Sequence, residues 1–450
     1  MGAGKIQLNA KGPTEFHLIG NPQITYFKKV FKRHTNFAKE TRRIFFSGEE
    51  RATFGSKNLK AEIKNEGDLI GKIFLDVVIT GTTASETYTV SNFANSLIEQ
   101  VVLDIGGFKI DTIYGRFNQI LEELKGNVSH QNQQISDTTY GGMYANIDRT
   151  NDNSQSLEII SPKMKTTGNY SLTFGGSHNG ISVSPGTFSK RLNIPLNFWF
   201  NKSEGMYLPL SALFRHKVSL FFDFASEASV KGDNAITNFT MTPKLYGEYV
   251  ILDDEEKKRF AQSNHEYIIE QHQLNNNAKE IVTTVVDNAQ QLGSMNIELN
   301  FNNPIKFFTW VIVNEGTQGS NKGVGPCYFT SLTESSLYGN DAQSGVVEIL
   351  LEGVTREIEM PMSFYTRIHP CNILGVVPTL DRIGFYSFAI DPLNAEPTGT
   401  CNFSKLYDKN IKISFANNNA NLLAGKDLYI YAINYNILTI TGGMAQVRYT

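Results

Sequence analysis

Paired cysteines, long apolar runs and a targeting segment are all missing from this 450-residue chain. Cys327, Cys371 and Cys401 are widely spaced and form neither a CxxC pair nor an even-numbered framework, so we expect a reducing compartment. The longest apolar run, around 305–313, is about half the length that a membrane span needs. With no signal-peptide pattern at the start, the sequence predicts a globular protein made in the cytosol.

An excess of positive charge is missing as well. Lys and Arg number 41 against 44 Asp and Glu, which gives a formal net charge of −3. Proteins that coat a polyanion carry a clear surplus of Lys and Arg. We therefore expect no sequence-specific nucleic-acid binding, and any contact with nucleic acid or anionic membrane would be local.

The motifs of common catalytic and cofactor sites are absent too. The chain has no GxxxxGK[ST] phosphate loop, and GGSHNG at 175–180 lacks the second glycine of a nucleophile elbow. His265 and His272 are seven residues apart in a strand-like run, which places them on opposite faces of a strand and disfavours a zinc site. We expect no metal, no cofactor and no enzyme.

Several carboxylates lie on strand-like segments, and a β-sandwich glycosidase therefore remains as an enzymatic alternative, because such enzymes use two facing carboxyl groups. Carboxylates in an antiparallel sheet are more often on its solvated face, which disfavours this reading. The candidates are Asp104, Asp111, Glu352 and Glu359.

What the chain does contain is strand signal. Short runs rich in Val, Ile, Phe and Tyr are bounded by Gly, Asn, Pro or Ser, and few helical patterns separate them, which predicts an all-β fold of antiparallel sandwiches or barrels. The clearest runs are 71–81, 101–110, 191–200, 217–225, 346–353 and 428–438.

These runs repeat in the two halves of the chain, which indicates an internal duplication. We match 103–110 with 351–358, 113–117 with 362–368, 217–225 with 412–417, 245–252 with 428–438, and 37–46 with 265–271. Helical patterns are predicted near 114–125 and 253–262, and a third at 22–33. The chain therefore predicts two β domains of roughly 200 residues, a normal domain size.

The segment 20–37 looks like a capped amphipathic helix. Asn21 suits the N-cap and Pro22 the first helical position, while Phe27 and Phe31 share an apolar face. Alone, it would suggest a helix for a membrane surface or nucleic acid. The similar pattern at 255–262 instead favours packing of Phe27 and Phe31 beneath the first domain. The basic residues of the segment 20–37 are Lys28, Lys29, Lys32 and Arg33.

Two long polar stretches, 126–189 and 314–345, interrupt the strand pattern and read as surface loops. Five N-glycosylation sequons are also present, as weak candidates in a chain without a secretory signal. They lie at Asn127, Asn169, Asn201, Asn238 and Asn402.

An ordered set of motifs resembles the major capsid proteins of large eukaryotic DNA viruses, and the chlorella-virus and mimivirus-like branches most of all. The motifs are GNPQITYF (20–27), RHTNFA (33–38), RFAQ (259–262), HEYIIEQ (265–271), PTGTCNFS (397–404) and IYAINYNILTITGGM (430–444).

The resemblance implies a double jelly roll, with two eight-stranded antiparallel sandwiches at 37–253 and 254–450 after an N-terminal segment at 1–36. It further implies a homotrimeric, pseudo-hexagonal capsomer that tiles an icosahedral shell, assembled in the host cytoplasm. Expected partners are neighbouring capsomers, minor capsid and penton proteins, and through the minor proteins an internal membrane. By the same resemblance the basic segment faces inward and the polar loops outward.

Three alternatives remain. A scaffold protein of the same lineage would be absent from purified virions. A β-sandwich lectin or glycosidase would be a monomer or small oligomer that binds saccharide. A nucleic-acid-binding protein would show DNA affinity that falls steeply with salt.

Overall fold

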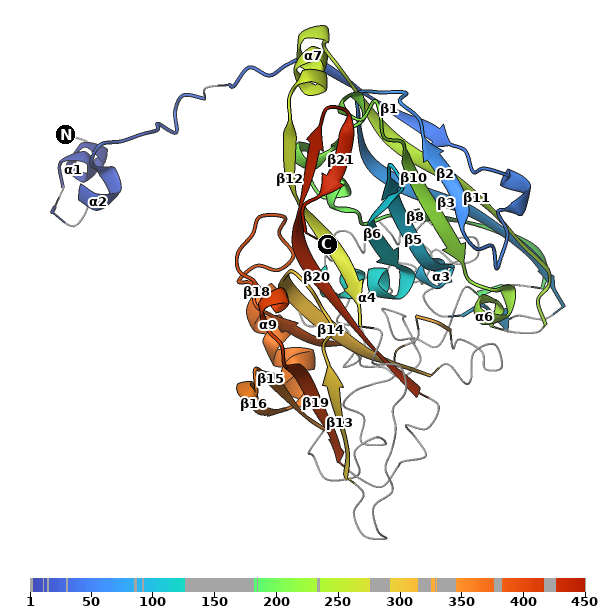
Figure 1. The fold of residues 1–450 in the computed structure, drawn as a ribbon. Coiled ribbons are helices and arrows are strands. Elements are labelled where there is room, and N and C mark those ends of the chain that lie inside the picture. Colours follow the sequence, from blue (N-terminus) through green and yellow to red (C-terminus); the bar gives the residue numbers. More distant parts are fainter. Residues whose placement is uncertain are drawn as a thin grey trace. The chain divides into compact units, whose positions relative to one another are not determined.

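The computed structural model describes residues 3–10, 12–13, 16–29, 31–84, 87–90, 93–125, 182–183, 185–232, 235–275, 292–314, 325–327, 329, 345–375, 383–416 and 426–449. The chain forms two compact units, Met1–Phe37 and Ala38–Thr450. The first contains the short helices α1 (Ala3–Asn9) and α2 (Phe16–Ile19). The second contains all the sheets described below (Figure 1).

The first half of the larger unit is a sandwich of two antiparallel sheets. One has the order β1-β11-β3-β8, with β9 beside β3, and the other the order β2-β10-β5-β6. The strands are β1 (Phe37–Ile44), β2 (Leu59–Ile63), β3 (Leu69–Thr83), β5 (Ile98–Ile105), β6 (Phe108–Tyr114), β8 (Gly186–Pro195), β9 (Leu208–Pro209), β10 (Val218–Phe224) and β11 (Thr237–Leu252), with β4 (Thr87–Tyr88) and β7 (Ser182–Val183) as a separate pair.

The second half repeats this arrangement. Its sheets have the orders β12-β20-β14-β17, extended by β18 and β21, and β13-β19-β15-β16. The strands are β12 (His265–Leu274), β13 (Leu292–Glu298), β14 (Pro304–Asn314), β15 (Val346–Leu351), β16 (Val354–Pro361), β17 (Gly384–Ser387), β18 (Cys401–Asn402), β19 (Lys409–Ala416), β20 (Lys426–Thr441) and β21 (Met444–Val447).

The two sandwiches have one topology. When the eight main strands of either half are counted in chain order, the sheets read 1-8-3-6 and 2-7-4-5 in both. This is the strand order of a jelly roll, so the fold is the predicted double jelly roll. The matched runs of the sequence fall on equivalent strands, with 217–225 on β10 and 412–417 on β19.

The hairpins β5–β6 and β15–β16 fix the correspondence more closely than the sequence does. Each turns through two residues with positive φ, Gly106 and Gly107 in one and Glu352 and Gly353 in the other, the backbone form that two-residue hairpins favour. Leu103 pairs with Asp111 and Ile349 pairs with Glu357 at equal distances from these turns. Asp111 therefore corresponds to Glu357, and the match made from the sequence was shifted by two residues.

Alternating burial explains why these segments form sheets. Along β3 the apolar side chains point into the first core at every second position while Lys72 is exposed, the period expected of a half-buried strand. The second core is built around the fully buried Trp310. Burial of such an aromatic side chain stabilises the fold by roughly 3 kcal/mol. The predicted strand at 191–200 ends earlier, at Pro195, and a 3₁₀ turn, Trp199–Asn201, follows.

Two of the three predicted helices form. They are α4 (Gly115–Lys125) and α7 (Asp254–Gln262). Other short helices are α3 (Phe93–Ser96), α6 (Glu227–Lys231), α9 (His369–Leu374), a π-helical turn (Phe364–Ile368) and 3₁₀ turns at Glu49–Arg51, Glu204–Met206, Leu210–Ala212 and Phe403–Lys405. No helix among the described residues is both long and apolar enough to cross a membrane.

The helix predicted at 22–33 is wrong. Its described residues are not helical, and Asn21 has a φ of +49°, which does not fit the extended backbone of an N-cap. A helix of about 12 residues is marginal in water without tertiary packing. The four neighbouring cations of this segment repel one another and destabilise a helix further. The helical spacing of its apolar residues alone therefore could not stabilise a helix.

A few residues within the two predicted polar stretches are described by the structure. The strand β8 already begins at Gly186, inside the predicted stretch 126–189. Within 314–345, Cys327 and Phe329 are buried, and Phe329 bridges to Val313 of β14. Burial raises the pKa of the Cys327 thiol to about 11. Most of the remainder of both stretches lies outside the described residues.

Candidate functional site

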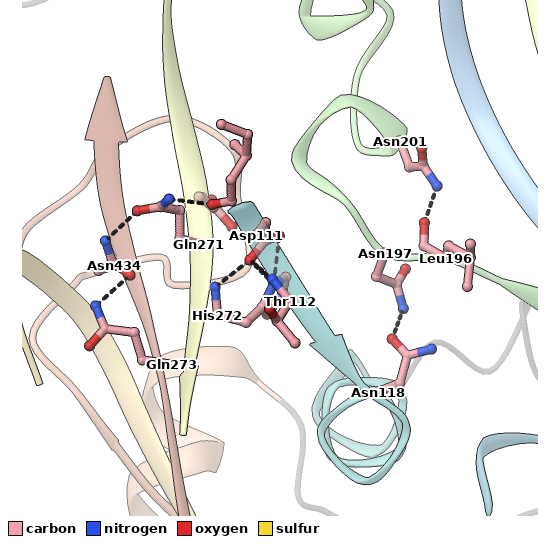
Figure 2. A network of polar contacts seen from close by, with 12 residues as sticks. Asp111, Thr112, Asn118, Leu196, Asn197, Asn201, Gln271, His272, Gln273 and Asn434 are labelled. Carbon is pink, nitrogen blue, oxygen red and sulfur yellow. Dashed lines mark hydrogen bonds and ion pairs between the residues drawn. The ribbon is translucent and has the colours of Figure 1, made fainter. Parts of the chain in front are cut away.

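The most elaborate polar arrangement in the described chain lies where the two jelly rolls meet. Strand β6 is the last strand of one sheet of the first jelly roll, and β12 is the first strand of one sheet of the second. Their edges approach each other and exchange hydrogen bonds (Figure 2). The junction matters because it sets how one jelly roll is held against the other.

A buried carboxylate forms the centre of this junction. Asp111 on β6 accepts from the backbone N–H of His272 at 2.9 Å, and its other oxygen lies 3.0 Å from His272 Nδ1. The same carboxylate accepts from the backbone N–H of Thr112 at 2.8 Å. The ring of Phe117 packs edge-on against His272, with 5.5 Å between ring centroids. With these partners, a carboxylate at 3% exposure has its hydrogen-bonding capacity met.

Two positions closer to the start of β12, an ionic contact crosses the junction. Glu270 is 2% exposed and pairs with Lys202 of the first jelly roll. Its other oxygen lies 2.8 Å from the ammonium of Lys306 on β14, a residue with no exposed surface. Burial acts to raise the pKa of Glu270, but the two ammonium groups outweigh it, and the pKa lies below its ordinary value.

Side-chain amides complete the seam. Gln271 Nε2 donates to the carbonyl of Ile110 on β6, while its carbonyl oxygen accepts from Asn436 Nδ2 at 2.9 Å. Gln273 Nε2 donates to Asn434 Oδ1 at 2.8 Å, within the second jelly roll. Four consecutive side chains of β12, residues 270–273, thus anchor this edge strand on both sides.

Helix α4 fills the space beside the seam. Its residues Phe117, Ile120, Leu121 and Leu124 recur at helical spacing and pack in one cluster with Phe307, Val311, Tyr431 and Ile433 of β14 and β20.

The polar face of α4 points toward the first jelly roll. Asn118 accepts from Asn197 Nδ2 at 2.5 Å and donates to the carbonyl of Pro195, and Gln119 accepts from Asn95 Nδ2 at 2.8 Å. The helix start permits no side chain, because a Cβ at Gly115 would lie 2.1 Å from the carbonyl oxygen of Ile98. The helix is thus fixed to one jelly roll by amides and to the other by apolar packing.

The junction has the composition of a structural joint. The Asp111–His272 pair resembles part of a catalytic triad, and His272 Nε2 has no hydrogen-bond partner among the described residues. The described residues hold no cluster of three or more potential metal ligands. What the geometry does is hold two sandwiches in one orientation.

The four strand carboxylates do not converge on a site. Asp104 accepts from the Gly107 N–H in its hairpin turn, and Glu359 is exposed. Glu352 accepts from the Tyr407 backbone N–H. The expected solvated position is wrong for Asp111, because β12 of the other jelly roll covers its strand. His265 Nε2 contacts the Phe260 carbonyl, while His272 Nδ1 contacts Asp111.

The basic N-terminal segment has a different character from the one predicted. Phe27 is fully exposed and Phe31 is 77% exposed, and the packing of these rings beneath the first jelly roll stays a prediction. Lys29 instead lies over the Phe31 ring, 5.2 Å from its centroid. Asn21, Pro22, Lys28, Lys32 and Arg33 are exposed as well.

The sequons differ in their surroundings. The side-chain nitrogen of Asn201 donates hydrogen bonds to the carbonyls of Ile73 and Leu196, so both of its N–H groups are already bonded. Asn402 is exposed and its carbonyl oxygen caps the Phe403–Lys405 turn, while Asn238 is exposed on β11. Asn127 and Asn169 lie outside the described residues.

Most junction residues escaped the sequence analysis. Lys306 offered the clearest signal, because it is a lone charge inside the apolar run 305–313, and a buried lysine requires a partner. Nothing local pointed to Glu270, Gln271 or Lys202 as that partner, since strand alternation does not show which jelly roll faces which.

Comparison with known families agrees with this architecture. The model of "Large eukaryotic DNA virus major capsid protein" matches residues 256–446, and that of "Major capsid protein N-terminus" matches residues 25–253. The chain belongs to the major capsid proteins of large eukaryotic DNA viruses. It is 30% identical to the major capsid protein of Pyramimonas orientalis virus and 31% identical to that of Paramecium bursaria Chlorella virus 1, over the full length of each chain.

Solved structures give the same result for this capsid protein. VP54 of PBCV-1, in a crystal structure fitted into a reconstruction of the Sputnik virophage, has a TM-score of 0.69 and 27% identity. The match covers 95% of this chain and all of that one. A quasi-atomic model of the PBCV-1 capsid gives a TM-score of 0.67 at 28% identity. The protein is a structural component of a virion, as the resemblance implied.

Proposed function

We propose that three copies of this capsid protein form a pseudo-hexagonal capsomer that tiles an icosahedral shell. The observation that supports it is the repeated strand order, 1-8-3-6 and 2-7-4-5, in two jelly rolls joined by a buried seam. Three such chains present six similar sandwiches around one axis. We place the division between the jelly rolls at residues 253–254, after an N-terminal segment at 1–36.

The mass of the purified protein tests this proposal. Light scattering should give three times the chain mass of 50.3 kDa, unchanged on dilution, because an obligate interface above roughly 2,000 Å² does not dissociate readily. A monomer at all concentrations would contradict it. Recovery of the chain as a major component of purified virions would exclude a transient scaffold of the same fold.

The basic segment supports a second part of the proposal. Lys28, Lys29, Lys32 and Arg33 are exposed beside the exposed rings of Phe27 and Phe31, a surface suited to a partner. We infer that this segment faces the shell interior and contacts minor capsid proteins, with an internal membrane beyond them. Penton proteins meet the capsomers at the vertices, and assembly takes place in the host cytoplasm.

Neutral replacements of the four basic residues test this role. Replacing Lys28, Lys29, Lys32 and Arg33 with Gln should leave the trimer mass unchanged and reduce the yield of closed particles. A variant that no longer forms trimers would show that these charges serve the capsomer itself.

The function proposed is structural and needs no catalysis or cofactor. A β-sandwich lectin or glycosidase would bind or cleave saccharide, and an absence of both activities in a stable trimer would eliminate it. Direct DNA binding with a steep salt dependence would revive the nucleic-acid alternative.

A further inference from the structure

A cavity of about 930 Å³ opens beside the seam, and residues of both jelly rolls line it. The first jelly roll contributes parts of β3, α4 and β8 and the segment 196–203, and the second contributes single residues of β14 and β20 and the segment 392–395. Figure 2 shows Asn197 and Asn201 of this wall on the segment that follows β8. A cavity of this volume accommodates a small molecule of nucleotide size.

The charged side chains of the wall are mostly cationic. Lys72, Lys125 and Lys202 come from three separate segments of the chain and line the cavity together with one acidic residue, Glu122. The lining residues therefore carry a surplus of positive charge. Lys72 is exposed and forms no ion pair with the described residues, so its charge is available to a ligand.

Lys202 is held in position by the buried carboxylate of Glu270. The same carboxylate also pairs with the fully buried ammonium of Lys306, so it balances only one of the two positive charges beside it. Asp391 interacts with the Lys306 ammonium as well, but this residue is exposed and water screens its charge. Positive charge thus remains at Lys202 for an anion in the cavity.

Lys125, at the end of α4, is positioned in a similar way. Its ammonium lies 3.5 Å from Glu122 and 3.4 Å from Asn197 Oδ1. Both contacts are long, and an exposed ion pair of this kind is weak and exchanges its partner at little cost. Two of the three ammonium groups are therefore oriented before a ligand arrives, which lowers the entropic cost of binding.

Much of the remaining wall is apolar, so the cavity offers two kinds of surface. Ammonium groups bind the charged part of a ligand, and apolar side chains can contact a flat ring. The apolar residues are Ile73, Phe74, Leu121, Pro195, Leu196, Phe307, Pro392, Leu393, Ala395 and Ile433.

We propose that this cavity binds a small polyphosphate, either free or as the phosphate chain of a nucleotide. Three ammonium groups from separate segments match an anion with several charges, and lysine binds phosphate as a point charge. The volume of the cavity limits the ligand to a small molecule and excludes a nucleic-acid duplex. Because both jelly rolls line the cavity, the bound anion stabilises their arrangement beside the seam. The site lies within one chain and does not depend on the capsomer proposed above.

Titration calorimetry with tripolyphosphate and with ATP, in the absence of divalent cations, tests the proposal on the purified protein. Both probes should bind, and the dissociation constants should rise at least about tenfold when NaCl is raised from about 50 mM to about 500 mM, because salt screens the attraction. Tighter binding of ATP identifies a nucleotide as the ligand, whereas equal affinity identifies a free polyphosphate.

A double substitution locates the binding site. Lys72→Gln with Lys125→Gln should weaken the binding of both probes by about tenfold or more, since two charged contacts are lost. The unfolding temperature of the ligand-free protein should stay the same, because neither lysine belongs to the seam. Lys57→Gln with Lys217→Gln is the matched control. It removes the same charge at side chains that are 51% and 75% exposed and lie outside the cavity, so binding should not change.

Acetylation of lysines gives a second readout on the unmodified protein and does not require a variant to fold. Tripolyphosphate should protect Lys72 and Lys125 from acetic anhydride and leave Lys57 and Lys217 as reactive as before. Mass spectrometry of the digested protein measures the extent of modification at each lysine.

Three results would overturn the site. They are the absence of binding by either probe at low salt, equal weakening of binding in the double variant and the control, and tighter binding of hexaglutamate than of tripolyphosphate, which would assign the cavity to an acidic peptide. None of these results depends on the mass of the protein in solution. A monomeric protein that binds polyphosphate would contradict the capsomer alone, and a trimer that binds none would contradict this site alone.

Discussion

Asp111 and His272, 161 residues apart in the chain, join the two jelly rolls through a single buried carboxylate that accepts from both the backbone and the ring of the histidine. The pair links strand edges rather than sheet faces. A tile made of two sandwiches needs a fixed angle between them, and directional hydrogen bonds at a buried seam define an angle more sharply than apolar contact does.

Asp111→Asn should destabilise the protein by about 1–3 kcal/mol. The amide oxygen can still accept from the backbone N–H groups of His272 and Thr112, but the NH₂ group can donate to His272 Nδ1 only if the ring proton moves to Nε2, where it has no partner among the described residues. Urea unfolding at neutral pH measures the change. Asp104→Asn is the control, since the Asn oxygen can still accept from the Gly107 N–H, and its cost should stay below about 0.5 kcal/mol. Equal costs for the two variants would show that the seam contributes little.

Glu270 makes stability depend on acidity. A carboxylate whose pKa is lower in the folded chain stabilises the fold above its unfolded pKa of about 4.3, and this contribution is lost as the pH falls through the folded-state value. We expect Glu270→Gln to be less stable than wild type at pH 7, with a difference that shrinks below about pH 4. Urea titrations from pH 7 to pH 3 measure it. A difference that does not change with pH would contradict the lowered pKa.

The junction shows what the sequence can and cannot predict. Strand alternation and the helical pattern at 114–125 are local, so two antiparallel β domains and α4 followed from them, whereas the double jelly roll was implied by the resemblance. The burial of Asp111 depends on a strand far away in the chain, and no local pattern records it.

The N-terminal segment shows the opposite failure. Its apolar spacing around Phe27 and Phe31 matched a helix, but spacing alone does not supply the packing that holds a short helix together. The pattern at 253–262 succeeded because α7 has acidic residues in its first turn and packs through Phe260 against Leu69, Tyr207 and Val250.

Gly384→Ala should be among the most damaging small substitutions in the second jelly roll. A Cβ at this position would lie 2.0 Å from Trp310 Cε2, and Trp310 is fully buried and unable to move aside. Overpacking of this kind costs about 3 kcal/mol. Thermal unfolding measures it, and Gly205→Ala is the control because nothing lies within 4 Å of its added Cβ. A neutral Gly384→Ala would mean that the core around Trp310 is loosely packed.

Lys306 offers the sharpest test of how much the buried ion pairs of the seam contribute to stability. Lys306→Met should cost about 3–5 kcal/mol, because it removes a fully buried partner of Glu270 and leaves the carboxylate with Lys202 alone. The double variant Lys306→Met, Glu270→Leu should be less destabilised than Lys306→Met. It leaves no buried carboxylate unpaired, and the Lys202 side chain, already 23% exposed, can turn to solvent. Urea unfolding of both single variants and the double variant gives the coupling energy. Simple additivity of the two costs would show that Glu270 and Lys306 act independently, and the seam would then owe its stability to apolar packing by α4.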